Sequence, residues 1–392
     1  MARLSTTSAH SEDREEDAIG QMVPARTHRL LVWATLAIGL LVLTEGALRY
    51  EHGHPGGGEG VEGVPPGMFV ADRHTGVTLR PGFVDPEGGF TVNSAGLRDP
   101  ERPPPRGAHW LLLGDELAAG LGVGDDEHLA RLLELGLSTS RDPAPEVWNG
   151  GVPRFGPEQV LMRSRTLSAS LRLDPQVVLL AVHLGNDARD AARGPGVDRV
   201  VDGRLVEVPW GPWPGSAFNG DRGRGSFLGR RLRRSYAIPA ALDLYLEPAS
   251  SPVERGWSIT ERALAQLAGE TRGTLVVLGI PGRLEGDTAV LEEELARGAA
   301  LAGRAVDVDA PQRRLEAITT ALDVPLILLR PALRASTEPT WYRDRDLLTA
   351  QGHRIVARTV LEQLAGRGIG PRLDLARVDA ALLGRTPRSQ AR

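Results

Sequence analysis

The chain has 392 residues, of which 41% are hydrophobic and 24% are charged, and its formal net charge is −4. These proportions exclude disorder of the whole chain, and the small charge, without a Lys/Arg stripe and interleaved aromatic residues, gives no reason to expect nucleic acid as a partner. Cysteine is absent, which excludes disulfides, thiolate metal sites and a cysteine nucleophile. The length is sufficient for one large domain with a full core.

The amino-terminal part of the sequence predicts a membrane anchor. Residues 1–28 are polar and acidic, and an apolar run from Leu30 to Leu43 continues less purely to Arg49. A span needs ~20 apolar residues, so the run is short. We predict a transmembrane anchor at 29–49 rather than a signal peptide or a core helix, because a long polar segment precedes it and a Gly-rich one follows it. Arg26 and Arg29 favour a cytoplasmic tail at 1–28 and a periplasmic or extracytoplasmic domain.

The remaining chain alternates strands with helices. Residues 50–67 are rich in Gly and Pro and are typical of a linker, and short alternating runs between 68 and 108 predict a small β element. Buried strands are predicted at Trp110, at Val147 and at 175–183, 274–280 and 324–329. Helices are predicted at about 127–137, 157–173, 258–268, 287–303, 315–322 and 353–364. This alternation predicts an α/β domain over 68–368 with a doubly wound parallel sheet. An insertion at about 191–252 is expected to cap its crevice, and 369–392 is expected to be a C-terminal tail that begins with a short helix.

Three predicted turns at strand ends carry polar residues, and a fourth polar cluster precedes the last long helix. The turns are Gly114-Asp115-Glu116, Asn149-Gly150-Gly151 and Gly185-Asn186-Asp187, and the cluster contains Asp344, Asp346 and His353. Because the carboxyl ends of parallel strands form the ligand crevice of an open sheet, we expect these residues to meet there. A glycine N–H and an asparagine amide aimed at one point are what an oxyanion hole requires.

The order and spacing of these turns resemble the SGNH hydrolases, also called GDSL esterases, over roughly Asp72 to Leu364. The family's G-D-S block corresponds to Gly114-Asp115-Glu116, its N-A-G-V-P-G-Y-G block stands here as N-G-G-V-P-R-F-G from Asn149 to Gly156, and its G-N-D block is intact. The resemblance implies a flavodoxin-like three-layer sandwich. It also implies that Gly151 and Asn186 hold the positions of the oxyanion-hole donors.

The departures from the family pattern affect the catalytic residues. Glu116 stands where the family has its serine nucleophile, and the final block places Asp344 on the catalytic acid and Leu347 on the catalytic base. A serine route needs an oxygen nucleophile within reach of an oriented base. A carboxylate beside an oxyanion hole would also repel an anionic intermediate. The sequence therefore predicts a degenerate site without hydrolase activity.

Two histidines are candidates to replace the missing base. His353 stands near the start of the last long helix and is expected to pack there, whereas His183 ends a core strand beside the crevice. Oxygen ligands from Glu116, Asp344 and Asp346 make a metal site conceivable, but no His/carboxylate spacing supports one, so we expect neither a metal nor a cofactor.

These observations predict a membrane-anchored envelope protein with a catalytically inactive SGNH-hydrolase-like domain, which binds an ester or an acetylated envelope glycan or lipid through Gly151 and Asn186. Two alternatives stay open. One is an active esterase or O-acyltransferase with a remodelled site that uses Glu116. The other is a non-catalytic envelope scaffold that recruits partners through the insertion at 191–252. The sequence identifies no protein partner.

Overall fold

The computed structural model describes residues 33–40, 43, 64–87, 89–103, 105, 107–140, 142–194, 198–201, 203–207, 242–297, 304–342 and 345–383. The chain divides into two compact units, one formed by 1–57 and 226–232 and the other by 58–225 and 233–392. Of the first unit, residues 33–40 are helical. Among the described residues, no helix is long and apolar enough to cross a membrane. The predicted anchor at 29–49 otherwise lies outside the described residues.

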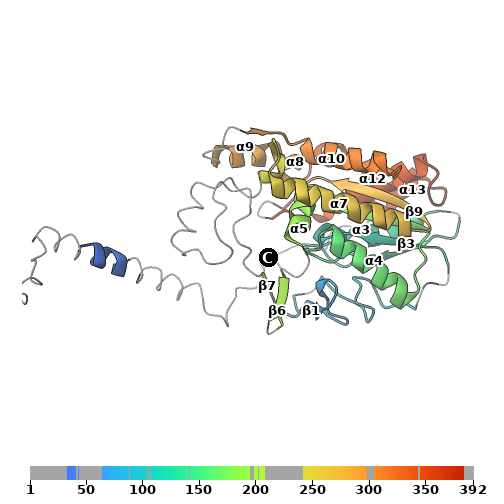
Figure 1. Cartoon of the computed structure of the whole chain (residues 1–392). Coiled ribbons are helices and arrows are strands. Elements are labelled where there is room, and N and C mark those ends of the chain that lie inside the picture. Colours follow the sequence, from blue (N-terminus) through green and yellow to red (C-terminus); the bar gives the residue numbers. More distant parts are fainter. Residues whose placement is uncertain are drawn as a thin grey trace, which may run out of the picture. The chain divides into compact units, whose positions relative to one another are not determined.

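The second unit is built on a five-stranded sheet in which every strand runs parallel to its neighbours (Figure 1). Its strands are β3 (His109–Leu113), β4 (Glu146–Asn149), β5 (Val177–His183), β9 (Thr274–Ile280) and β11 (Leu326–Leu328). The spatial order is β11-β9-β5-β3-β4, which is 2-1-3-4-5 in the order in which the chain enters the sheet. This is the flavodoxin-like order of a doubly wound fold, and the predicted α/β sheet is confirmed.

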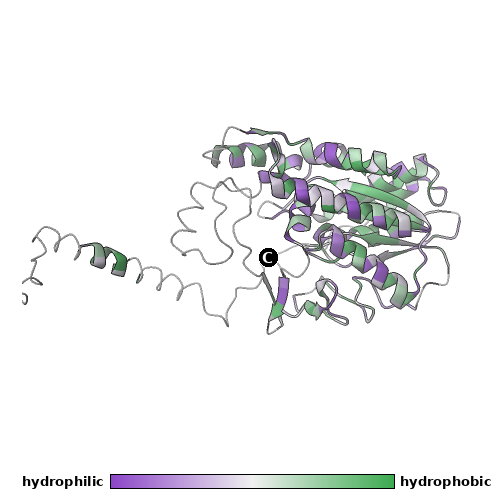
Figure 2. Cartoon of the chain, viewed as in Figure 1, coloured by the Kyte–Doolittle hydropathy of each residue, from purple (hydrophilic) through white to green (hydrophobic). Residues whose placement is uncertain are grey.

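Successive side chains of a strand point to opposite faces of the sheet, so the sheet contributes to two separate hydrophobic cores. All seven residues of β5 are buried, as expected for a strand covered on both faces. Val178 and Leu180 belong to one core together with side chains of α4 (Pro157–Leu171) and α7 (Ser251–Glu270). Val177 and Leu179 belong to the other, with side chains of α3 (Leu129–Leu137) and α12 (Ala350–Gly366). The result is a three-layer sandwich, in which hydrophobic strands are covered by helices with hydrophilic outer positions (Figure 2).

The folded domain extends beyond the predicted boundary at 368. Helix α13 (Leu375–Leu383) packs against α3 and α12, and its Val378 and Leu382 are buried in the second core. The two residues are four positions apart and therefore share one face of the helix. The short helix expected within 369–392 is present as α13, but it belongs to the folded domain, so the predicted domain boundary at 368 is too early. Residues 384–392 lie outside the described residues.

Short β elements surround the sheet. The predicted element within 68–108 is present as the antiparallel pair β1 (Phe69–Asp72) and β2 (Gly76–Leu79). A second pair, β6 (Asp198–Val201) and β7 (Arg204–Glu207), lies in the predicted insertion, and β8 (Leu246–Glu247) pairs with β10 (Ala305–Val306). The remaining elements are α2 (Glu116–Ala119), α5 (Asp187–Arg193), η2 (Asp243–Tyr245), α8 (Arg283–Gly286), α9 (Thr288–Arg297), α10 (Ala310–Ala321) and α11 (Arg330–Arg334). The insertion's tryptophans, Trp210 and Trp213, and its arginine run at 230–234 lie outside the described residues.

The strand order determines where a crevice opens. After β3 the chain moves outward to β4 and then crosses to β5 on the other side of β3. The connections after β3 and β5 therefore leave in opposite directions, and ligands of open α/β sheets bind at such a switch point. Glu116 follows β3 and Asn186 follows β5, so both stand at this position.

Candidate functional site

The turn after β3 presents Glu116 at the start of a short helix. A Cβ atom at Gly114 would lie 2.9 Å from the carbonyl oxygen of Ala181 on β5, so only glycine fits this close approach. Asp115 caps α2, because its Oδ1 accepts a hydrogen bond from the Leu117 N–H at 2.9 Å. Glu116 is thereby the first residue of α2 and is only partly buried.

Two donors from other segments hold the Glu116 carboxylate. The Asn186 side-chain amide donates from Nδ2 to Oε1 at 2.9 Å. The backbone N–H of Arg154 donates to Oε2 at 2.9 Å. Arg154 has a φ of 70°, a left-handed conformation that favours glycine, and the family block has glycine at this position. Each carboxylate oxygen of Glu116 therefore has a fixed donor.

The two residues expected to form an oxyanion hole are both engaged within the protein. Gly151 donates its N–H to Oδ1 of Asn149 at 3.0 Å, and the Asn186 amide donates to Glu116. An ester carbonyl would have to compete with a neutral oxygen for the first donor and with a carboxylate for the second. Hydrogen bonds to an ionised acceptor are the stronger ones, so the Asn186 donor is the less available of the two.

His183 stands at the centre of three carboxyl groups. Its ring is 1% exposed, with Nδ1 at 3.1 Å from Asp115 Oδ2 and 3.8 Å from Glu116 Oε1. On the opposite side, Nε2 lies 3.4 Å from Asp346 Oδ2. The backbone N–H of His183 donates to Asp187 at 2.9 Å. His183 therefore connects the β3 turn with the loop that precedes α12.

These contacts shift the pKa values of His183, Glu116 and Asp115. Burial alone would lower the pKa of His183, but the charge of Asp346 and the bond to Asp115 raise it well above its usual value. Burial alone would raise the pKa of Glu116, yet His183 and the Arg154 N–H lower it to about 2. Burial, reinforced by the Glu116 charge, raises the pKa of Asp115 to about 6. At neutral pH the site therefore holds carboxylates around an imidazolium.

Two residues of the family's last block lie in packing positions. Leu347 is 6% exposed and belongs to the second core. His353 is buried in α12, and neither ring nitrogen has a hydrogen-bond partner among the described residues. Burial and then the charge of Arg98 lower the pKa of His353 to about 3, so its ring is neutral near pH 7. Asp344 lies outside the described residues.

A cavity of about 230 Å³ opens beside Glu116, and its lining is almost entirely polar. Arg154 lines it and forms a bidentate pair with Asp198 of β6, with Nε–Oδ2 at 2.6 Å and Nη2–Oδ1 at 3.0 Å. The lining consists of Glu116, Arg154, Gln159, His183, Asn186, Arg189, Asp190, Arg193, Gly194, Asp198 and Asp346. The first strand of the predicted insertion thus reaches the crevice, as the expected cap would.

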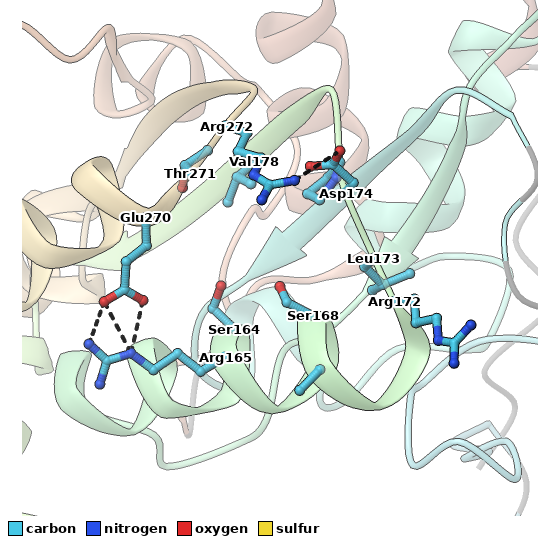
Figure 3. Close-up of a pocket in the computed structure, with 12 residues that line it drawn as sticks. Ser164, Arg165, Ser168, Arg172, Leu173, Asp174, Val178, Glu270, Thr271 and Arg272 are labelled. Carbon is cyan, nitrogen blue, oxygen red and sulfur yellow. Dashed lines mark hydrogen bonds and ion pairs between the residues drawn. The ribbon is translucent and has the colours of Figure 1, made fainter.

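A larger cavity of about 560 Å³ lies at the amino end of β5, between α4 and the end of α7 (Figure 3). Its rim carries an ion pair between Arg165 and Glu270. None of the expected site residues lines it. The smaller cavity at the carboxyl edge is therefore the better candidate, because it contains expected site residues, including Glu116 and His183, whose pKa values are strongly shifted.

Asp115, Glu116 and His183 are close enough to share a ligand. One atom from each, two carboxylate oxygens and a ring nitrogen, lies within 4.8 Å of the others. The sequence pointed to Glu116 and His183 individually but not to their contact. The sequence groups Asp346 with Glu116 and Asp344 as conceivable metal ligands, whereas in the structure Asp346 contacts His183. The sequence did not predict the site role of Arg154. The signal for Arg154 was an arginine where the family block has glycine.

No protein-family model matches the chain, and no curated protein matches it. Solved structures to which it is similar include LAE5, an α/β hydrolase enzyme from the metagenome of Lake Arreo, at 13% identity and a TM-score of 0.39, with 67% of this chain and 95% of that chain covered. A lipase/acylhydrolase from Enterococcus faecalis has 14% identity and a TM-score of 0.38, with 67% and 97% covered. A catalytic mutant of Axe2, an acetylxylan esterase from Geobacillus stearothermophilus, has 15% identity and a TM-score of 0.37, with 66% and 94% covered. The chain's own sheet order defines a flavodoxin-like α/β fold, and these identities carry no information on a substrate.

Proposed function

We propose that this chain is a membrane-anchored envelope protein whose SGNH-hydrolase-like domain does not hydrolyse esters by serine catalysis. The observation that supports this most directly is the engagement of the Glu116 carboxylate by Asn186 Nδ2 and Arg154 N, each at 2.9 Å. A fixed anion occupies the donor that would stabilise a reaction intermediate. The side chain at this position also has no hydroxyl group to activate.

The electrostatics of the site support the same proposal. An oxyanion hole accelerates acyl transfer because preorganised donors meet a charge that develops only in the transition state. Here the pKa of Glu116 is lowered to about 2, so its carboxylate is charged in the resting protein. A second negative charge beside it would be repelled.

The cavity lining favours a glycan over a lipid as the ligand of this domain. An acyl chain needs apolar walls, whereas the described walls beside Glu116 are formed by charged and amide side chains. Hydroxyl groups of a sugar can exchange hydrogen bonds with such side chains. We propose that an acetylated envelope glycan binds through Arg154, Arg189 and Asp190 rather than by capture of its carbonyl.

A probe of activated serines tests the loss of serine catalysis. A fluorophosphonate should leave the full chain unmodified, and p-nitrophenyl acetate turnover should be equal in the wild type and in Glu116→Ala. Labelling of any serine would contradict the proposal. Turnover that is lost in Glu116→Ala would instead favour a remodelled esterase, for which the 3.8 Å approach of His183 Nδ1 to Glu116 Oε1 would supply an acid–base pair.

The proposed membrane anchor is supported by exposed apolar side chains. Trp33, Leu36, Ile38 and Leu40 are 69%, 57%, 61% and 67% exposed. A cluster of large apolar side chains in water indicates a surface that is covered in the cell. The full chain should remain with membranes after alkaline carbonate extraction, and a variant with aspartate at Leu36 and Leu40 should be released. Release of the wild type would contradict the anchor.

A further inference from the structure

The geometry points to a divalent transition-metal site formed by Asp115, Glu116 and His183. This inference concerns the same crevice but does not rest on the proposed loss of ester hydrolysis. It adds a ligand of defined chemistry to side chains that the resemblance to the hydrolases leaves without a role.

The three side chains converge on one point from neighbouring strands. Asp115 Oδ2 and Glu116 Oε1 lie 3.1 Å and 3.8 Å from the same ring nitrogen of His183. One nitrogen carries at most one proton, so it can donate a good hydrogen bond to only one of the two oxygens. A metal ion in place of that proton would bind both carboxylates and the nitrogen at once.

Each proposed ligand is held by a partner on its other atom. The Leu117 N–H fixes the second oxygen of Asp115, and the Arg154 N–H fixes the second oxygen of Glu116, each at 2.9 Å. The far nitrogen of His183 faces Asp346 at 3.4 Å. Metal-binding histidines characteristically direct their second nitrogen at a carboxylate, which sets the tautomer and orients the ring.

Asp346 is itself positioned for this supporting role. Its Oδ1 accepts a hydrogen bond from the Arg283 N–H at 2.7 Å, which leaves Oδ2 directed at His183. The carboxylate therefore orients the imidazole from outside the proposed coordination sphere. This places Asp346 among the positioning residues and not among the ligands.

One buried polar atom at the site, Oδ1 of Asn186, has no hydrogen-bond partner among the described residues, and its residue is 8% exposed. Nε2 of His183, in contrast, faces Asp346 Oδ2 at 3.4 Å. Asn186 donates from Nδ2 to Glu116 Oε1 at 2.9 Å, and it therefore holds the oxygen that Glu116 offers to the ion.

The donor set defines the class of metal. Calcium and magnesium prefer oxygen ligands alone, whereas an imidazole with carboxylates suits zinc or manganese. We therefore expect Zn²⁺ and Mn²⁺ to bind more tightly than Ca²⁺ or Mg²⁺. The binding is expected to involve one ion per chain.

Calorimetric titration of the full chain, freed of metal with a chelator, tests the inference. Wild type should bind Mn²⁺ and Zn²⁺ at one site, and Glu116→Gln and Asp115→Asn should each lose it, with folding checked by circular dichroism. Asp346→Asn should weaken binding by about 10–100-fold, the usual effect of removing a carboxylate that orients a metal-bound histidine. Glu270→Gln, at the opposite end of the sheet (Figure 3), should bind as the wild type does.

Zinc can also bind His52 and His54 of the predicted linker, so the zinc titrations use a chain with both changed to alanine. Equal binding by wild type and Glu116→Gln, or no binding by wild type, would overturn the metal site. Ester turnover measured with and without the ion separates the two proposals. Ester turnover by the metal-loaded chain would overturn the proposed loss of hydrolysis and leave the metal site intact as a proposal. A chain that binds no ion and turns over no ester would overturn the metal site and leave the proposed loss of hydrolysis intact.

Discussion

Substitutions of Arg154 measure separately how its backbone strain and its ion pair affect the stability of the protein. Its φ of 70° costs a residue with a Cβ atom about 1–2 kcal/mol relative to glycine. Its guanidinium forms the bidentate pair with Asp198, and the two side chains are 21% and 12% exposed. A hydrogen-bonded charge pair contributes about 1–3 kcal/mol when buried, and partial exposure moves this value towards the lower end.

The two substitutions therefore give different results. Arg154→Ala loses the pair and keeps the strain, so its free energy of unfolding should fall by about 1–2 kcal/mol. Arg154→Gly loses the pair but relieves the strain, so its free energy of unfolding should be about 1 kcal/mol higher than that of Arg154→Ala. Both keep the backbone N–H that holds Glu116. Urea denaturation followed by tryptophan fluorescence measures the difference, and Asp198→Ala completes a double-mutant cycle for the pair. An alanine variant as stable as the glycine variant would refute the reasoning.

Three further predictions concern the site and its support. Glu116→Ser should show no p-nitrophenyl acetate turnover above background, because a general base contributes about 10²–10⁴-fold. Activity in this variant would mean that another residue is the base. Gly151→Ala should lower the free energy of unfolding by about 1–3 kcal/mol, because a Cβ atom there would lie 2.4 Å from the Ala119 nitrogen. The unfolding midpoint should fall accordingly, and an unchanged midpoint would refute the close approach. Burial raises the pKa of Glu285 from 4.5 to about 8. As the pH rises, this carboxyl group therefore loses its proton in the unfolded chain before it does so in the folded one. The free energy of unfolding should fall between these two pH values, by at most about 1.4 kcal/mol per pH unit. Glu285→Gln should remove that part of the decline, and a stability profile identical to that of the wild type would contradict the shift.

Much of the fold could be predicted from local patterns. The apolar run 175–183 and the run 274–280 predicted buried strands, and β5 and β9 occupy them. Each strand is buried on both faces, so its sequence is apolar throughout. The end of the domain was harder to predict, because α13 is amphipathic and short. Its burial depends on the surface that α3 and α12 offer.

The sequence by itself determined that Glu116 and Leu347 stand where the resemblance to the SGNH hydrolases predicts the nucleophile and the base, since both positions follow from the order and spacing of the motifs. Only the tertiary structure decided what surrounds the glutamate. Asn186 and Arg154 donate to it, and His183 approaches it. Asp346, 230 residues further along the chain than Glu116, contacts the far nitrogen of His183. These contacts depend on the strand order, which brings the ends of β3 and β5 together. They also depend on the loop before α12, and spacing along the chain does not encode either arrangement.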